Sequence, residues 1–299
     1  MSAPARGGVG PGVPDGRAVR AGFEAHYVAK WRDHQGFWVD SYPRPLDLYA
    51  DLLRQRNAAI LRAIPPTAGS VLDCGSGVGD LSALLVAQGA DVVSLDVTAV
   101  HARRTRDNLR GQDGFHGAVV ADAAALPFKA GTFDAVVLAD VLEHLLDPVD
   151  ALRECSRQLR GRGIVVIVTP DRRVLAGWGA VDAVAQGGLR AARAVARRVR
   201  GTRRAPVRPG TTCFERLVSR AEARQAVAAA GLEVVEHRRI CFYPGPEGGG
   251  ALASALLLLD GLSPALGRAC VAALRPMFGA VERTGLLNQK QLLVARARP

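Results

Sequence analysis

The sequence predicts an α/β protein, in which short apolar strands alternate with helices along the chain. A glycine-rich turn at residues 69–79 joins an apolar strand to a helical segment. Further apolar strands are expected at residues 90–96, 117–121, 132–138 and 164–168, and helical segments separate most of them. This alternation is typical of a parallel sheet that is covered by helices.

The glycine-rich turn reads Gly-Ser-Val-Leu-Asp-Cys-Gly-Ser-Gly-Val-Gly. Its strand carries Asp73, and glycines follow at alternate positions, Gly75, Gly77 and Gly79. Because glycine lacks a Cβ, the backbone can approach a ligand closely and aim its N–H groups at it. A dinucleotide-binding turn needs its last glycine where this chain has Asp80, so the spacing argues against a nicotinamide cofactor.

The pattern Asp-x-Gly-x-Gly-x-Gly resembles motif I of the class I S-adenosylmethionine-dependent methyltransferases. The landmarks from about Ser70 to Pro170 resemble the ubiquinone-biosynthesis-like branch of small-molecule methyltransferases. The resemblance implies a Rossmann-like sheet of seven strands, six parallel and the seventh antiparallel, with helices on both faces. It also implies S-adenosyl-L-methionine as the cofactor.

The resemblance assigns cofactor-binding roles to residues at the strand ends. Asp73 would order the turn and the cofactor's amino group, and backbone near Gly75 would meet the methionine portion. An acid at the tip of the second strand, Asp96, can accept both ribose hydroxyls, although it could instead cap the next helix. Asp122 would bind the adenine amino group, and the N–H of Ala123 a ring nitrogen. The complete predicted set is Asp73, Gly75, Gly77, Gly79, Asp96, Val97, Asp122, Ala123 and Asp140.

His144 is the predicted general base, because it follows the fourth strand at the edge where α/β sheets bind ligands. It could equally pack at the entry of the helix after Asp147-Pro148. Asp140, Glu143 and His144 have i, i+3, i+4 spacing, which puts them on one helical face. Ubiquinone-type O-methyltransferases have a similar stretch that binds a divalent ion, so the resemblance also implies a Mg²⁺ site, with Asp in place of the first Glu.

These features predict a methyltransferase that acts on a small lipophilic or aromatic acceptor, by O-methylation in quinone-like or secondary-metabolite biosynthesis. C-methylation of a similar acceptor and a non-catalytic binding protein are the alternatives. Nucleic acid is not the expected substrate. Adenine-specific enzymes carry Asp/Asn-Pro-Pro-aromatic after the fourth strand, where this chain reads Ala-Asp-Val-Leu at residues 139–142.

Composition indicates the compartment and one unusual segment. The chain has 299 residues, 48% of them apolar, and five cysteines without Cys-x-x-Cys spacing, which favours reduced thiols in a cytoplasmic protein. The Gly/Pro-rich start has no apolar core typical of a signal peptide. The formal charge is +11, and residues 172–208 hold ten arginines against one acid, Asp182. The remainder is therefore near neutral.

We divide the chain into five parts. Residues 1–19 are expected to be a disordered tail, 20–66 an N-terminal helical cap, and 67–171 the cofactor-binding core. Residues 172–210 form an Arg-rich insertion or lid after the fifth strand, and 211–299 complete the methyltransferase domain beneath an apolar helical cover. Aromatic residues in the N-terminal cap, from Phe23 to Trp38, are expected to pack on the sheet, to shape the acceptor site, or both.

The C-terminal part carries its own local signals. Ser219-x-x-Glu222 predicts a capping box, followed by a helix to Ala230 and a sixth strand over 232–240. Residues 289–296 are the predicted seventh strand. Apolar helices at 251–262 and 265–287, which Pro264 and Pro276 should break, are expected to cover the substrate pocket or to form a homodimer interface. Arg190–Arg208 can form a basic helical face, which predicts a solvated lid or peripheral membrane contact.

Overall fold

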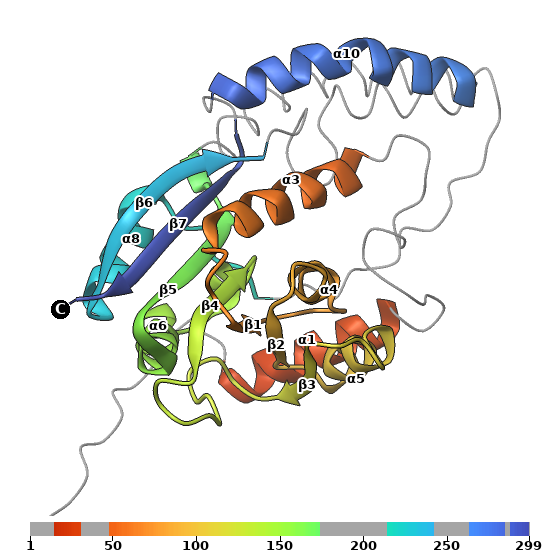
Figure 1. The fold of residues 1–299 in the computed structure, drawn as a ribbon. Helices are drawn as coiled ribbons and strands as arrows, with labels where there is room; N and C mark the ends of the chain where they lie inside the picture. Colours follow the sequence, from red (N-terminus) through yellow and green to blue (C-terminus); the bar gives the residue numbers. More distant parts are fainter. Residues whose placement is uncertain (1–14, 31–47, 174–213, 242–262, 285–287, 299) are drawn as a thin grey trace, which may run out of the picture.

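The computed structural model describes residues 15–30, 48–173, 214–241, 263–284 and 288–298 (Figure 1). These residues form a seven-stranded sheet of order β3-β2-β1-β4-β5-β7-β6. The strands are β1 (Ser70–Cys74), β2 (Asp91–Asp96), β3 (Phe115–Val120), β4 (Phe133–Ala139), β5 (Leu159–Pro170), β6 (Leu232–Ile240) and β7 (Lys290–Ala297).

Strand pairing confirms the predicted topology. β1 pairs with β2 and β4 in parallel, β2 with β3, and β4 with β5, whereas β7 runs antiparallel between β5 and β6. The strand order changes side at β1, because β2 and β3 lie on one side of β1, and β4 and β5 lie on the other. In open α/β sheets, ligands bind at this switch point, outside the carboxyl ends of the strands.

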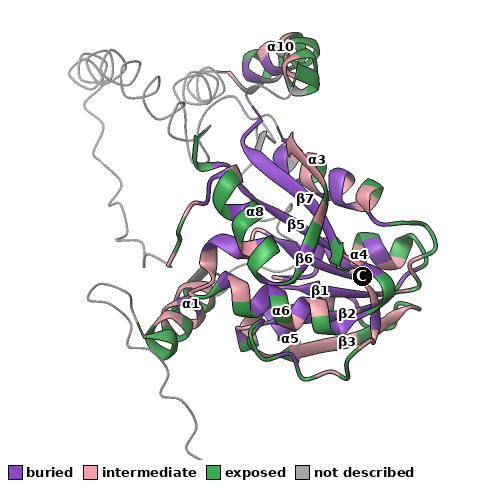
Figure 2. Ribbon diagram, turned by 90° about the vertical axis from the view of Figure 1, so that its left-hand side faces the viewer, coloured by how far each residue is buried: buried purple, intermediate pink, exposed green. Residues whose placement is uncertain are grey.

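Helices cover both faces of the sheet (Figure 1). Apolar residues of α3, α4 and α10 form one core with alternate strand residues such as Val71, and those of α6 and α8 form the other core with residues such as Leu72. Figure 2 shows the central strands between these layers as mostly buried, whereas the edge strands β3 and β6 are mostly of intermediate exposure. The helices are α1 (Gly16–Lys30), α3 (Leu48–Ala63), α4 (Asp80–Ala87), α5 (Ala99–Asn108), α6 (Pro148–Gln158), α8 (Arg220–Ala229) and α10 (Pro264–Thr284), with a 3₁₀ turn η1 (Leu142–His144).

Several boundaries differ from the sequence-based expectation. Helix α1 begins at Gly16, before the expected cap boundary at residue 20. The prediction that Pro276 breaks the last helix is wrong, because α10 continues through it. A proline removes one backbone hydrogen bond and can kink a helix without ending it. The capping box of Ser219 and Glu222 is confirmed.

Other expectations lie outside the described residues. These are the Arg190–Arg208 face, the apolar segment at 251–262 and the aromatic residues from Trp31 to Trp38. Among the helices that the structure does describe, none combines the length and the apolar character needed to cross a bilayer.

Candidate active site

The glycine-rich turn connects β1 to α4 with a backbone that requires glycine. Gly75, Gly77 and Gly79 all have positive φ angles, of 88°, 58° and 92°. A Cβ on Gly75 would collide with the side chain of Val141, which comes from the loop after β4. The turn therefore lies directly against the end of β4, and only glycine leaves room for both.

Asp73 fixes the start of the turn from inside the protein. It is 1% exposed, and the hydroxyl of Ser82 in α4 donates to its Oδ2 at 2.6 Å. Burial raises the pKa of Asp73 to about 6, although the hydrogen bond from Ser82 acts in the opposite direction. The predicted ordering role of Asp73 is consistent with this contact between β1 and α4.

Asp96 is the last residue of β2, and its carboxylate accepts several hydrogen bonds. Its Oδ1 accepts from the N–H and hydroxyl of Thr98, both at 2.9 Å, and its Oδ2 accepts from the N–H of Gly77 at 3.0 Å. His101 Nδ1 lies 3.3 Å from Oδ2. Burial alone would raise the pKa of Asp96. The contacts from His101 and Thr98 outweigh that effect, so the pKa of Asp96 lies below its ordinary value. If a ribose bound to this carboxylate, its hydroxyl groups would donate to Asp96 and would replace some of the present donors, such as the N–H of Gly77.

Asp122 and Ala123 follow β3 at the next position along the same edge. The Oδ1 of Asp122 accepts from the N–H of Ala124 at 2.9 Å, which shapes the loop. The side chain of Asp122 remains exposed, whereas Ala123 is buried.

Asp140 follows β4, on the other side of β1 from Asp96 and Asp122, and its carboxylate pairs with two cationic side chains. It adopts the left-handed region, with a φ of 58°. Its Oδ2 accepts from Arg56 of α3 and its Oδ1 from Lys290 of β7, each at 2.8 Å. Burial would raise the pKa of Asp140, but the charges of Lys290 and Arg56 lower it to about 2. Sequence reasoning missed both cations.

Glu143 is buried in η1 at 2% exposure, and its Oε2 accepts from the hydroxyl of Thr169 at 2.8 Å. Burial, together with the negative charge of Asp140, raises the pKa of Glu143 to about 8. The carboxyl group is therefore mainly protonated at neutral pH.

His144 has one ring nitrogen committed to the backbone. Its Nδ1 lies 2.7 Å from the carbonyl oxygen of Phe214, which can only accept, so Nδ1 carries the proton in this contact. In the neutral ring Nε2 then holds a lone pair. The ring of Phe23 packs edge-on against the imidazole, with centroids 5.3 Å apart. The imidazole is therefore held by contacts on two sides.

The predicted magnesium ligands do not gather around one point. Asp140 faces Arg56 and Lys290, Glu143 faces Thr169, and His144 binds a backbone carbonyl. Among the described residues, no group of three or more His, Cys, Asp or Glu side chains could hold a metal ion. We therefore derive no step through a metal.

These strand-end residues line one cavity of about 600 Å³. The order of the strands sets their sequence along its wall: Asp122 after β3, Asp96 after β2, Gly75 after β1, and Asp140 to His144 after β4. Gly79 is the predicted cofactor residue that does not line the cavity. It packs against α5 instead, where a Cβ would meet Thr105 at 3.0 Å.

The residues present fit S-adenosyl-L-methionine. The glycine-rich turn borders the cavity through Gly75 and Gly77, and Asp96 and Asp122, which the resemblance assigns to ribose and adenine, place two carboxylates on its wall. The amino-terminal cap contributes as well, because Phe23 and Tyr27 of α1 line the cavity. That these two side chains shape an acceptor site stays a prediction.

Comparison with known proteins shows similarity to methyltransferases over part of the chain. Residues 72–167 match the family model described as a methyltransferase domain. The chain is 39% identical over 110 residues to a demethylmenaquinone methyltransferase of Clavibacter sepedonicus, covering 36% of this chain and 44% of that one. It is 30% identical over 182 residues to a ubiquinone biosynthesis O-methyltransferase of Rhizobium etli, covering 58% and 64%. The chain thus spans less than two thirds of either relative.

A solved structure agrees in fold. The 1,6-didemethyltoxoflavin-N1-methyltransferase of Burkholderia thailandensis has a TM-score of 0.57 with this chain at 15% identity, covering 97% of this chain and 94% of that one. The fold is therefore the Rossmann-like methyltransferase fold. Residues 72–167, which match the methyltransferase domain model, form the central part of this fold.

Proposed function

We propose that this chain transfers a methyl group to a hydroxyl of a small, lipophilic or aromatic acceptor. The observation that carries the choice of O-methylation is the state of His144. Its Nδ1 proton is donated to the carbonyl of Phe214, so Nε2 of the neutral ring remains as an acceptor, and His144 lines the cavity. A hydroxyl needs such a base, because it becomes nucleophilic as its proton leaves.

The strand order supports an assignment of the two ends of the cavity. The cofactor would extend from Asp122 past Asp96 to Gly75, and the acceptor would occupy the region beyond β4. When bound, S-adenosyl-L-methionine supplies an activated methyl group on a sulfonium. The chain contributes position: it holds the acceptor oxygen near that methyl, which can be worth ~7–11 kcal/mol of the barrier.

Apolar side chains support the proposed class of acceptor. Phe23, Tyr27, Leu53, Leu145 and Leu146 line the cavity. Such walls favour a greasy or aromatic ring and exclude water from the reacting atoms. The names of the matched relatives, a demethylmenaquinone and a ubiquinone methyltransferase, accord with such an acceptor.

A labelling experiment tests the proposal. The chain is incubated with a metabolite extract and S-adenosyl-L-methionine carrying a labelled methyl, and mass spectrometry finds the product that gains it. Fragmentation or NMR of that product then gives the bonded atom. A label on oxygen supports the proposal, a label on carbon favours the C-methylation alternative, and no transfer despite cofactor binding favours a non-catalytic binding protein.

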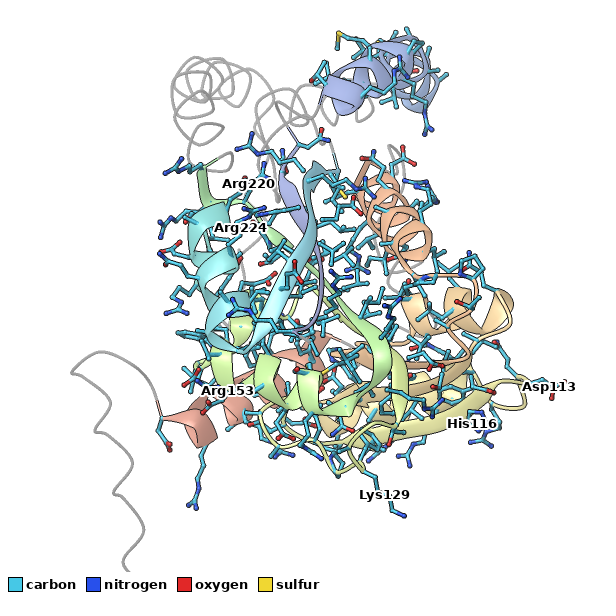
Figure 3. All side chains as sticks on the ribbon, turned by 60° about the vertical axis from the view of Figure 1, so that its left-hand side comes forward. Asp113, His116, Lys129, Arg153, Arg220 and Arg224 are labelled. Carbon is cyan, nitrogen blue, oxygen red and sulfur yellow. The ribbon has the colours of Figure 1, made fainter. Side chains whose placement is uncertain are left out.

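The role of His144 has its own test. We expect His144→Gln to lower turnover of the identified acceptor by about 10²–10⁴-fold while cofactor affinity stays within about twofold. His116→Gln is the matched control, since His116 lies on β3 away from the cavity and pairs with Asp91 at the surface (Figure 3). Equal turnover of the two variants would remove His144 from the mechanism.

A further inference from the structure

A second cavity, of about 740 Å³, lies between α3, β6 and the C-terminal end of α10. Its described lining is strongly basic and includes no aspartate or glutamate. Five arginines and one histidine line it: Arg62, Arg220, His237, Arg238, Arg239 and Arg283. Like charges repel unless an anion lies between them, so this lining is suited to a negatively charged ligand.

Neighbouring contacts hold some of these guanidinium groups in place. Arg239 pairs with the fully buried carboxylate of Asp171 at 2.9 Å. Arg238 pairs with Glu236. Arg220 donates to the carbonyl oxygen of His237 at 2.8 Å. The side chains are thus positioned, and the acids that position them do not line the cavity.

Arg62 and Arg283 bring further charge from two separate helices. Arg62 lies near the end of α3 and Arg283 near the end of α10, and both are exposed. Within the described part of the chain, neither takes part in an ion pair. Five arginines therefore line the cavity. Two of them pair with acids, Glu236 and Asp171, that do not line it.

His237 lines this cavity between neighbouring arginines. Arg224 donates to its Nδ1 at 3.0 Å, so the neutral ring carries its proton on Nε2, which lies 2.9 Å from the side-chain oxygen of Gln291. Burial, with the charges of Arg220 and Arg224, lowers the pKa of His237 to about 4. Figure 3 shows Arg220 and Arg224 on α8.

We propose that this cavity binds the phosphate or diphosphate group of a ligand. A guanidinium is always charged and presents its N–H groups as a planar fork that matches phosphate oxygens. Several such forks that line one cavity from α3, α8, β6 and α10 suit a group with many oxygens better than a single small anion. The inference goes beyond the proposed methyl transfer and does not depend on it.

The second cavity adjoins the acceptor end of the first. Ile240 lines the second cavity, and its partner in the β6–β7 register, Lys290, lines the first. Helix α3 borders both, through Arg56 on one side and Arg62 on the other. Two sources of the phosphate group fit this place: a soluble phosphorylated small molecule, or the headgroup of an anionic phospholipid at a membrane surface.

Two binding measurements on the full chain distinguish these sources. Sodium pyrophosphate is titrated calorimetrically, and sedimentation is measured with vesicles of phosphatidylcholine alone or with added phosphatidylglycerol. The test variant is Arg62→Gln with Arg283→Gln. The matched control is Arg103→Gln with Arg110→Gln, which removes two exposed arginines of α5 and the turn after it.

We expect the test variant to bind at least about tenfold more weakly than the control, which should bind as the unmodified chain does. Loss of pyrophosphate binding supports a soluble phosphorylated ligand, and loss of binding to anionic vesicles alone supports a lipid headgroup. The proposal is overturned if the unmodified chain binds neither probe, or if both variants bind equally well. Titration with S-adenosylhomocysteine on the same samples reports separately on folding and on the methyltransferase site.

Discussion

Replacing Asp140 with asparagine removes one negative charge between two cations and leaves the shape almost unchanged. Arg56 and Lys290 each contact this carboxylate at 2.8 Å. Asparagine tolerates the left-handed backbone that Asp140 adopts at φ 58°, so the substitution should add little strain. The variant therefore isolates the effect of the charge.

The magnitude follows from the pKa of Asp140 and from its burial. Lowering that pKa from 3.8 to about 2 is worth ~2.5 kcal/mol of stability at neutral pH. Removing one partner of a fully buried ion pair costs about 3–5 kcal/mol. Because the side chain of Asp140 is 21% exposed, we expect a loss near the lower figure, about 2–3 kcal/mol.

Urea unfolding at several pH values tests this reasoning. The pKa of Asp140 is lower in the folded chain, so its contribution is present above pH 4 and is lost as pH falls through 4 toward 2. The difference between the unmodified chain and Asp140→Asn should therefore be largest at pH 7 and about half as large at pH 3. Asp107→Asn, which breaks an exposed pair with Arg110, should cost less than about 0.5 kcal/mol. If Asp140→Asn were as stable as this control, the ion pairs of Asp140 with Arg56 and Lys290 would not stabilise the chain as expected.

Two further predictions concern the turn and Glu143. Gly75→Ala should destabilise the chain by about 3 kcal/mol or more and abolish S-adenosylhomocysteine binding, because it adds both positive-φ strain and a collision with Val141. Gly89→Ala has a similar φ of 86° but open space around its Cβ, and should cost only about 1–2 kcal/mol in the same urea assay; equal losses would dismiss the collision. Glu143→Gln should stabilise the chain by about 1–3 kcal/mol at pH 7. The pKa of Glu143 is raised to about 8 in the folded chain, so the folded chain loses stability as pH rises from 4.5 to 8, and glutamine avoids this loss. A stability difference that does not grow over that pH interval would contradict the buried, protonated state of Glu143.

The sheet and the glycine-rich turn could be predicted because their signals are local. Apolar runs and a glycine pattern occupy consecutive residues, and the structure confirms the strands they indicate. The ends of the strands have weaker local signals. The sequence predicts a third strand that begins at Gly117, but β3 begins at Phe115, because the turn before it is made at Gly114, with a φ of 87°. Likewise β5 begins at Leu159 and includes the segment Arg160 to Gly163, which has the composition of a turn.

The charged contacts of Asp140 could not be predicted, because they join residues that are far apart in the sequence. Arg56 and Asp140 are separated by 84 positions, and Asp140 and Lys290 by 150. Local periodicity carries no information about such contacts. The magnesium prediction assumed that residues 140–144 form a regular helix. Instead Asp140 is left-handed and the helical turn includes only residues 142–144, so the three side chains face different partners.

Calorimetric titration with S-adenosylhomocysteine tests the central claim most directly, namely that the cavity beside Gly75 and Asp96 holds an adenosyl cofactor. The account predicts one site per chain with a dissociation constant of about 1 μM to 1 mM. Asp96→Ala should weaken that binding at least about tenfold, because two ribose hydroxyls lose a charged acceptor. No heat of binding, or binding of NADH in place of S-adenosylhomocysteine, would contradict it.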